Sequence, residues 1–226
     1  MNCPPKSISI PAAVSVLAML ASLIFAINYP AVEGIGDKVR LPVFHGAMTW
    51  ANLMVFAGLV LAAAIYLKRG GEGDWARVTA MRWVTIGMWL VGSVLGFVAA
   101  LNTWDFTGSL SPASEVMLAD PRLVIQLVIS LGGIAVLVAP LLTESRRVRA
   151  AIDIIFVVAL WVGLGLATSI KGGLHPDSPV LNSDEIIIKL LFFAMVISQL
   201  VMAVAASTAL ANWLRFRSGS RVKTEG

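Results

Sequence analysis

The sequence predicts an all-α, polytopic membrane protein with six transmembrane helices and both termini in the cytoplasm. The first reason is composition: of the 226 residues, 58% are hydrophobic and only 13% are charged, with a mean hydropathy of +0.86. A soluble domain cannot bury so much apolar surface. The second is that apolar runs recur at bilayer length, since a spanning helix needs roughly 20 apolar residues. The third is an uneven distribution of basic residues between alternate loops.

The apolar runs indicate a single transmembrane domain over residues 1–226. Its six spans are expected at about 9–29, 42–67, 83–104, 122–143, 151–170 and 187–214. The first span follows Lys6, but its apolar core is too long for a signal peptide and no small-residue cleavage site follows, so we expect a retained helix. The second carries His45 near its start. The third contains GSVLG, whose small residues favour close packing between helices.

Polar residues mark the boundaries of the last three spans. Before the fourth, the segment SPASEVMLADPR (111–122) predicts a short capped helix with an apolar side, which would lie over the outer mouth of the bundle. The fifth span is the shortest, and Asp153 is expected near a membrane edge. NSDE (182–185) predicts a cap for the sixth. Four tryptophans near span ends are expected to anchor the protein at the membrane interfaces: Trp50, Trp83, Trp89 and Trp213.

The basic residues orient the chain. With six spans, one side of the membrane receives both termini and the second-to-third and fourth-to-fifth loops. That side holds twelve basic residues: Lys6, Lys68, Arg69, Arg77, Arg82, Arg146, Arg147, Arg149, Arg215, Arg217, Arg221 and Lys223. The other side holds five: Lys38, Arg40, Arg122, Lys171 and Lys189. Because basic loops remain in the cytoplasm, we expect both termini there and the longer, turn-rich loops outside.

Several function classes are excluded or disfavoured. The basic residues are divided among short loops, so there is no patch for nucleic acid. Cys3 is the only cysteine, which excludes an internal disulfide and a cysteine-ligated metal cluster. The sequence lacks the G-x-x-x-x-G-K, H-E-x-x-H and G-x-S-x-G signatures of soluble enzymes. A transporter is disfavoured because no charged residue inside the spans marks an ion path. Since the elaborated loops are external, we expect the functional site there.

The two histidines, His45 and His175, are both predicted on the outer side. Two imidazoles brought together from separate segments suit bis-histidine coordination of haem iron. The alternative is that His45 hydrogen-bonds a backbone carbonyl at the interface and His175 is a solvated turn residue. A zinc site is disfavoured, because the outer loops supply no third histidine or cysteine. Gly172 and Gly173 would let the loop of His175 move, whereas a helix fixes His45.

Three segments resemble the CcmC/CcsA-type cytochrome c assembly family. HGAMTW (45–50) resembles the H-V-P-x-x-W that opens its second span, and LHPDSP (174–179) resembles the segment of its second histidine. ADPRLVIQLVISLGGIAVL (119–137) is similar to the W-D-x-R-L segment that opens its fourth span. The resemblance implies haem b held on the outer face of the cell membrane between His45 and His175, then handed to a haem chaperone or to cytochrome c. It implies a binding and transfer protein more than a catalyst acting alone.

The resemblance also implies site residues in the third-to-fourth loop. Asp120 and Arg122 match the family's D-x-R, and the Arg122 guanidinium suits a haem propionate. The family's tryptophans are absent from EVMLADPR, and Trp104, in NTWDFTG, is the alternative match to its W-D pair. A loop without these rings loses much of the flat apolar surface on which a porphyrin rests.

The missing tryptophans leave two other interpretations open. One is a haem-b anchor subunit of a larger respiratory electron-transfer complex, which uses the same two histidines. The other is a membrane subunit that has kept the fold without the haem. Membrane lipid and other membrane subunits are the expected partners in both.

The predicted orientation can be tested with reporter fusions. Fusions at residues 110 and 180 should report an external location, and a fusion at Gly226 an internal one, because twelve basic residues face five. Paired reporters, one active only outside and one only inside, provide the control. A cytoplasmic signal at residue 110 would contradict the predicted orientation and put the histidines in the wrong compartment.

Overall fold

A computed structural model describes residues 5–32, 36–103, 120–169, 180 and 182–222. Over these ranges the protein is helical, and six helices are long and apolar enough to cross a membrane. The elements are α1 (Lys6–Ile27), η1 (Asp37–Val39), α2 (Arg40–Arg69), α3 (Glu72–Thr103), α5 (Pro121–Val138), η2 (Ala139–Leu141), α6 (Arg146–Ser169) and α7 (Ile186–Val222). The prediction of six membrane-spanning helices is therefore confirmed at the level of length and composition.

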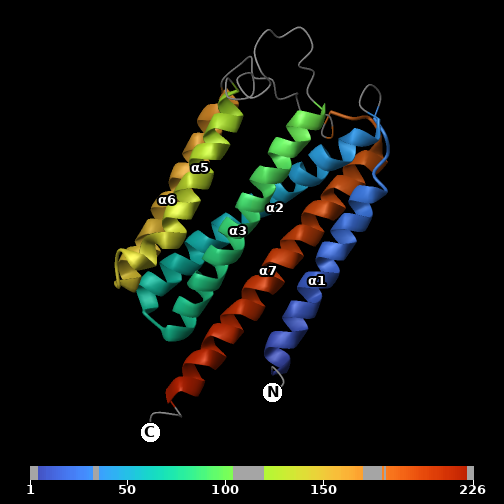
Figure 1. The fold of residues 1–226 in the computed structure, drawn as a ribbon. Coiled ribbons are helices and arrows are strands. Elements are labelled where there is room, and N and C mark those ends of the chain that lie inside the picture. The colour runs from blue at the N-terminus through green and yellow to red at the C-terminus, as the bar shows by residue number, and fades with distance from the viewer. Residues whose placement is uncertain (1–4, 33–35, 104–119, 170–179, 181, 223–226) are drawn as a thin grey trace.

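The helices form a bundle with two distinct ends (Figure 1). One end, here called the terminal end, carries both chain termini and the α2–α3 and α5–α6 connections. At the opposite, far end, α1 and α3 finish and α2 and α5 begin. The segment SPASEVMLADPR, predicted to cover this end, lies outside the described residues up to position 119. Residues 182–185 directly precede α7 as expected, and the Ser183 hydroxyl accepts a hydrogen bond from the N–H of Glu185.

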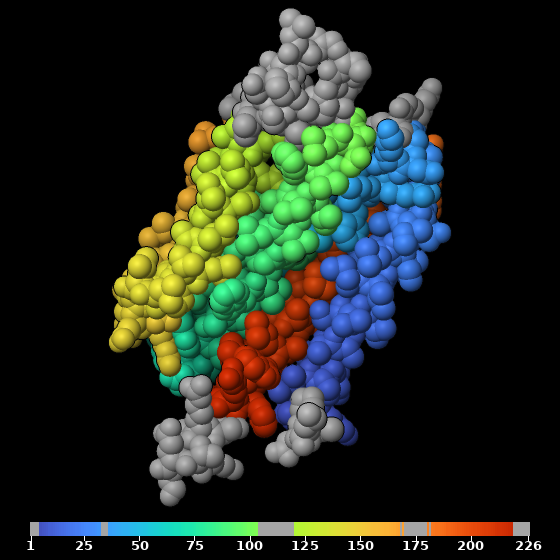
Figure 2. All heavy atoms as spheres, in the orientation of Figure 1, coloured from blue at the N-terminus to red at the C-terminus, as the bar shows by residue number. Residues whose placement is uncertain are grey.

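Two helix pairs flank a central hairpin. α1 packs along α7 on one side, α5 packs against α6 on the other, and α2 and α3 contact both pairs (Figure 1). In the space-filling view, α3 covers the middle of α2 (Figure 2). In its most apolar stretch, α3 has 44% of its residues buried, against 11% for α1. The α2–α3 hairpin is thus the core of the bundle, whereas most residues of α1 are not buried by the other helices.

Polar contacts attach α1 to α7 along its whole length. The Asn212 amide donates to the carbonyl of Ser7, the Ser15 hydroxyl to the carbonyl of Met202, and the Gln199 amide to the Ser22 hydroxyl at 2.9 Å. Such hydrogen bonds are useful inside a membrane, where lipid tails give neighbouring helices no hydrophobic drive to associate.

The turn between α2 and α3 is much tighter than the sequence suggested. Gly70 adopts a left-handed conformation (φ 72°), and its N–H bonds the carbonyl of Tyr66, which ends α2. The helix α3 starts two residues later, at Glu72, and not near residue 83. Its first turn carries Glu72 and Asp74, whose charges favour a helix N-terminus. Hydropathy alone could not detect these polar turns, because they lie beyond the apolar run.

A buried ion pair joins α3 to α6 near the terminal end. Arg82 donates two parallel hydrogen bonds to Asp153, from Nε at 2.7 Å and from Nη2 at 2.6 Å. Arg82 is 3% exposed and Asp153 is fully buried. Asp153, predicted near a membrane edge, is thus buried against a partner helix, and Arg82 lies within α3 and not in a loop. The pair lies inside the packed helices, so the premise that the spans hold no internal charge was wrong.

An aromatic and basic layer lies over this ion pair. The guanidinium groups of Arg82, Arg146 and Arg149 each lie 5.3–5.8 Å from the centre of the Trp75 ring. Arg146 also forms an exposed ion pair with Glu72. Cations favour the face of an indole ring, so Trp75 draws the beginning of α6 towards the beginning of α3.

Breaking the buried pair should destabilise the protein far more than breaking the exposed one. We expect Asp153→Asn to lower the free energy of unfolding by about 3–5 kcal/mol, because it leaves the Arg82 charge buried without its counter-ion. The control is Glu72→Gln, which should cost below about 1 kcal/mol, since that pair is solvent-exposed. Unfolding by denaturing detergent would measure both. Equal effects would show that the buried pair has no special role.

Candidate functional site

The candidate functional site lies at the far end, where the side chain of His45 packs against α3. His45 is in the second turn of α2, and its imidazole lies against the backbone of Gly96. A Cβ placed on Gly96 would be 2.5 Å from Cε1 and 2.7 Å from Nε2 of the ring. Only glycine leaves room for the imidazole here, and Nδ1 of the ring is shielded from solvent. The helix and this contact together fix the ring.

The same face of α3 repeats this close approach one turn deeper. A Cβ on Gly92 would be 3.3 Å from the sulfur of Met48. Gly92 and Gly96 are spaced by four residues and so lie on one side of the helix. The expectation that GSVLG serves close helix packing is confirmed, and the helix it packs against is α2.

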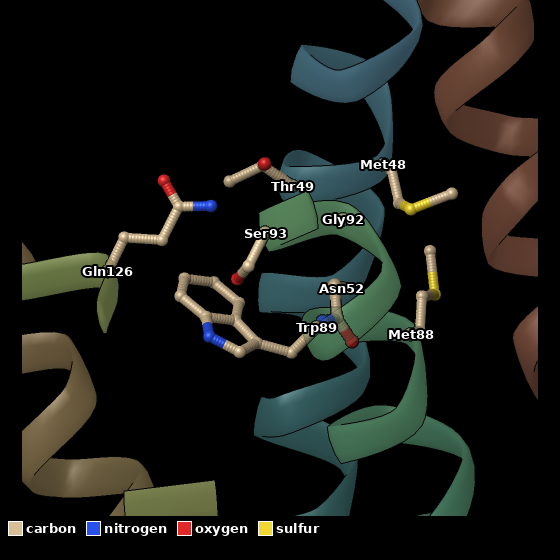
Figure 3. A pocket seen from close by; sticks show the side chains of 8 residues that line it. All are labelled: Met48, Thr49, Asn52, Met88, Trp89, Gly92, Ser93 and Gln126. Carbon is tan, nitrogen blue, oxygen red and sulfur yellow. The ribbon is translucent and has the colours of Figure 1, made fainter. Parts of the chain in front are cut away.

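A small polar cavity lies directly below this contact, between α2, α3 and α5. Its volume is about 10 Å³. It is lined by Met48, Thr49, Asn52, Met88, Trp89, Gly92, Ser93 and Gln126 (Figure 3). In Figure 3 the Gln126 amide extends from α5 towards Thr49 and Ser93. Two amides and two hydroxyls thus surround one space inside a membrane-spanning bundle.

Ser130 organises a hydrogen-bond network beside the cavity. Its hydroxyl donates to the carbonyl of Gln126 at 2.8 Å and accepts from the indole N–H of Trp89 at 3.2 Å. The Ser93 hydroxyl lies 3.0 Å away. Because Ser130 has only one hydrogen, and it is used, Ser93 must be the donor in this contact. Ser130 is then saturated, and it ties α5 to two residues of α3.

The side chain of Asn52 differs from these in making no hydrogen bond to any of the described residues. It is 1% exposed, and neither its Oδ1 nor its Nδ2 has a hydrogen-bond partner among the described residues. Leaving a buried polar group unpaired costs roughly 1–3 kcal/mol. The side chain lines the polar cavity, so its hydrogen-bonding capacity is directed into that space.

Residues one turn outward from the cavity form its rim. His45 precedes Thr49 by four positions in α2, and the Thr49 hydroxyl donates to the His45 carbonyl at 3.1 Å. Arg122 precedes Gln126 by four positions in α5, and Gly96 completes the rim from α3. Residues four apart lie on the same helix face. His45 and Arg122, both singled out from the sequence, therefore lie at the same end of the bundle, on two helices that each pack against α3.

Asp120 is the N-terminal cap of α5. Its side chain accepts a hydrogen bond of 2.8 Å from the backbone N–H of Arg122, and Pro121 occupies the first helical position. It is 1% exposed. Loss of such a cap typically costs about 1 kcal/mol. The matching D-x-R sequence thus positions Arg122 through the helix start, with the Asp120 side chain buried at the cap.

Other predicted site residues cannot be placed. His175 and Trp104 lie outside the described residues, so their approach to His45 is a prediction. Among the residues that are described, no three His, Cys, Asp or Glu side chains gather in a way that could hold a metal ion.

Tyr29, just beyond the end of α1, is a buried phenol near the start of α2. Its carbonyl accepts a hydrogen bond from Arg40 Nε at 3.1 Å, and its ring is 1% exposed. Burial raises the pKa of the phenol to about 12. The folded protein therefore favours the neutral phenol, which is a poor iron ligand compared with tyrosinate.

The prediction that Trp89 anchors the protein at the membrane interface was wrong. Trp89 is 5% exposed and donates to Ser130, so it is a core residue and not an interfacial anchor. Trp50, Trp83 and Trp213 are 39–50% exposed. The sequence reasoning also missed Asn52, although a lone amide amid apolar residues was a readable signal of a buried polar site.

No protein-family model matches the sequence, and no curated protein matches it significantly.

Replacing Gly96 should disturb His45 specifically. In Gly96→Ala the new methyl would overlap the imidazole, so we expect a loss of about 1–3 kcal/mol in the free energy of unfolding and a changed NMR shift of the His45 ring. Gly87→Ala is the matched control on the same helix, because a Cβ there meets nothing within 4 Å. It should be neutral or stabilising by up to about 1 kcal/mol. An unchanged His45 resonance in Gly96→Ala would contradict the described contact.

Proposed function

We propose that this protein is a membrane haem carrier of the cytochrome c assembly type. It holds haem b at the far end of the bundle, with His45 and His175 as axial ligands, and releases it to a haem chaperone or to cytochrome c. The far end is on the extracytoplasmic face of the cell membrane, because the terminal end bears most of the basic residues.

The observation that carries the proposal is the imidazole of His45, fixed against Gly96 at the end of the bundle where α5 begins with Arg122. Imidazole nitrogen is a common axial ligand of haem iron, and guanidinium binds carboxylates through paired hydrogen bonds. The two residue types thus suit a haem, with the imidazole as a ligand for the iron and the guanidinium as a partner for a propionate. When bound, the haem would be the cargo that the protein delivers to the acceptor.

The protein's own residues have distinct tasks in this scheme. Gly96 leaves space for the His45 ring and fixes its orientation. Asp120 and Pro121 begin α5 so that Arg122 stands at the rim. The ligand on α2 is rigid, while His175 belongs to a glycine-containing loop. A rigid ligand paired with a loop ligand favours exchange of the haem over permanent retention.

The ligands are tested by the absorption spectrum of the purified protein with haem. His45→Ala and His175→Ala should each abolish the low-spin bis-histidine spectrum, with His175→Ala retaining weaker haem binding through the fixed ligand. Arg122→Gln should weaken haem binding about tenfold, equivalent to about 1.4 kcal/mol. Lys189→Gln, which removes a basic residue of α7 without touching the rim, is the control. Unchanged spectra in both histidine variants would reject the proposal.

A transfer assay separates a carrier from an electron-transfer subunit. Haem-loaded protein mixed with excess apoprotein of a haem acceptor should lose its haem to that acceptor within the assay. Retention of a redox-active haem, together with co-purification of a respiratory catalytic subunit, would instead indicate the anchor-subunit alternative. No haem binding at all would indicate the haem-free subunit.

A further inference from the structure

We propose that the cavity between α2, α3 and α5 is a binding site for one ordered water molecule, held by Asn52. This site lies in the interior of the transmembrane bundle and does not rest on haem binding. It is separate from the iron ligands, since it lies one turn deeper than His45.

The size of the cavity limits which ligands can bind in it. A cavity of about 10 Å³ offers the space of a single water molecule, and a larger organic ligand does not fit. The two methionines, Met48 and Met88, close the side away from Gln126 (Figure 3). The cavity therefore takes one small molecule and no more.

The polar groups that line the cavity fit a neutral ligand that can both donate and accept hydrogen bonds. The Thr49 hydrogen is used on the His45 carbonyl and the Ser93 hydrogen on Ser130, so both hydroxyls face the site as acceptors. The Asn52 amide offers a donor and an acceptor, neither used elsewhere among the described residues. A water molecule can accept from the Asn52 amide N–H and donate its two hydrogens to two of the three acceptors, which are the Thr49 hydroxyl, the Ser93 hydroxyl and the Asn52 oxygen.

Charge excludes the ionic alternatives. None of the residues lining the cavity carries a formal charge. A small cation would find oxygen atoms but no carboxylate, and an anion would find no basic group. Inside a membrane-spanning bundle an uncompensated ion is costly, which leaves a neutral molecule.

The water completes a link that side chains alone do not make. Ser93 and Trp89 of α3 bond Ser130 of α5 directly. On the α2 side, Asn52 joins this network only through the molecule in the cavity. Water thereby connects α2 to the α3–α5 network, at the level where internal polar groups must satisfy one another.

Radiolytic footprinting in nanodiscs tests the site with side chains already present. A short X-ray pulse produces hydroxyl radicals from bound water, and these oxidise the nearest side chains. Met48 and Met88 line the cavity, whereas Met195 is fully buried in the apolar core. With a scavenger present to remove radicals from bulk solvent, we expect Met48 and Met88 to be oxidised several-fold more than Met195, as measured by mass spectrometry.

Variants show whether Asn52 holds the water. Asn52→Leu keeps the branched shape of the side chain without its polar atoms and should reduce oxidation of Met48 and Met88 to the level of Met195. Gln199→Leu, which removes another buried amide far along α7, should leave that oxidation unchanged. If thermal unfolding shows that Asn52→Leu is not folded, Ser93→Ala provides the same test. Equal protection of all three methionines in the wild-type protein, or undiminished oxidation in a folded Asn52→Leu protein, would overturn the proposal.

Discussion

The close approach of α2 and α3 is the constraint on which the rest of the structure depends. A turn at Gly70 reverses the chain at once, and Gly92 and Gly96 then let the two helices approach with Met48 and His45 between them. Lipid tails are as apolar as leucine, so such van der Waals contact is a main source of stability between helices in a membrane. The outer pairs α1–α7 and α5–α6 pack against a hairpin that is already fixed.

Polar contacts occur at three levels along the α2–α3 hairpin. At the terminal end, the Arg82–Asp153 pair joins α3 to α6. In the middle, Ser130 joins α3 to α5. At the far end, His45 lies on Gly96. Because lipid cannot satisfy polar groups, the first two levels fix α6 and α5 relative to the hairpin, and the third fixes α2 against α3 within it.

The six apolar runs were sufficient to predict the fold class, since hydropathy over bilayer length is the strongest signal in such a sequence. They could not reveal where polar turns continue a helix, as at Glu72, or that Asp153 faces a partner 71 positions away. Such pairing depends on which helices become neighbours, and spacing along the chain does not encode it. For the same reason, the sequence could single out His45 as a candidate, but it could not reveal that the His45 ring lies against Gly96.

Aromatic rings lie between the polar cavity and the buried ion pair. Phe56 lies one turn below Asn52 in α2, and Phe156 lies about one turn from Asp153 in α6, towards the far end. The Phe56 ring contacts both Trp89 and Phe156, with ring centres 5.9 Å apart in each case, and Phe56 is fully buried. This aromatic layer separates the polar cavity from the ion pair. A charged solute crossing it would lose hydration without gaining a partner. The buried charges of α3 and α6 therefore favour a role in holding helices together.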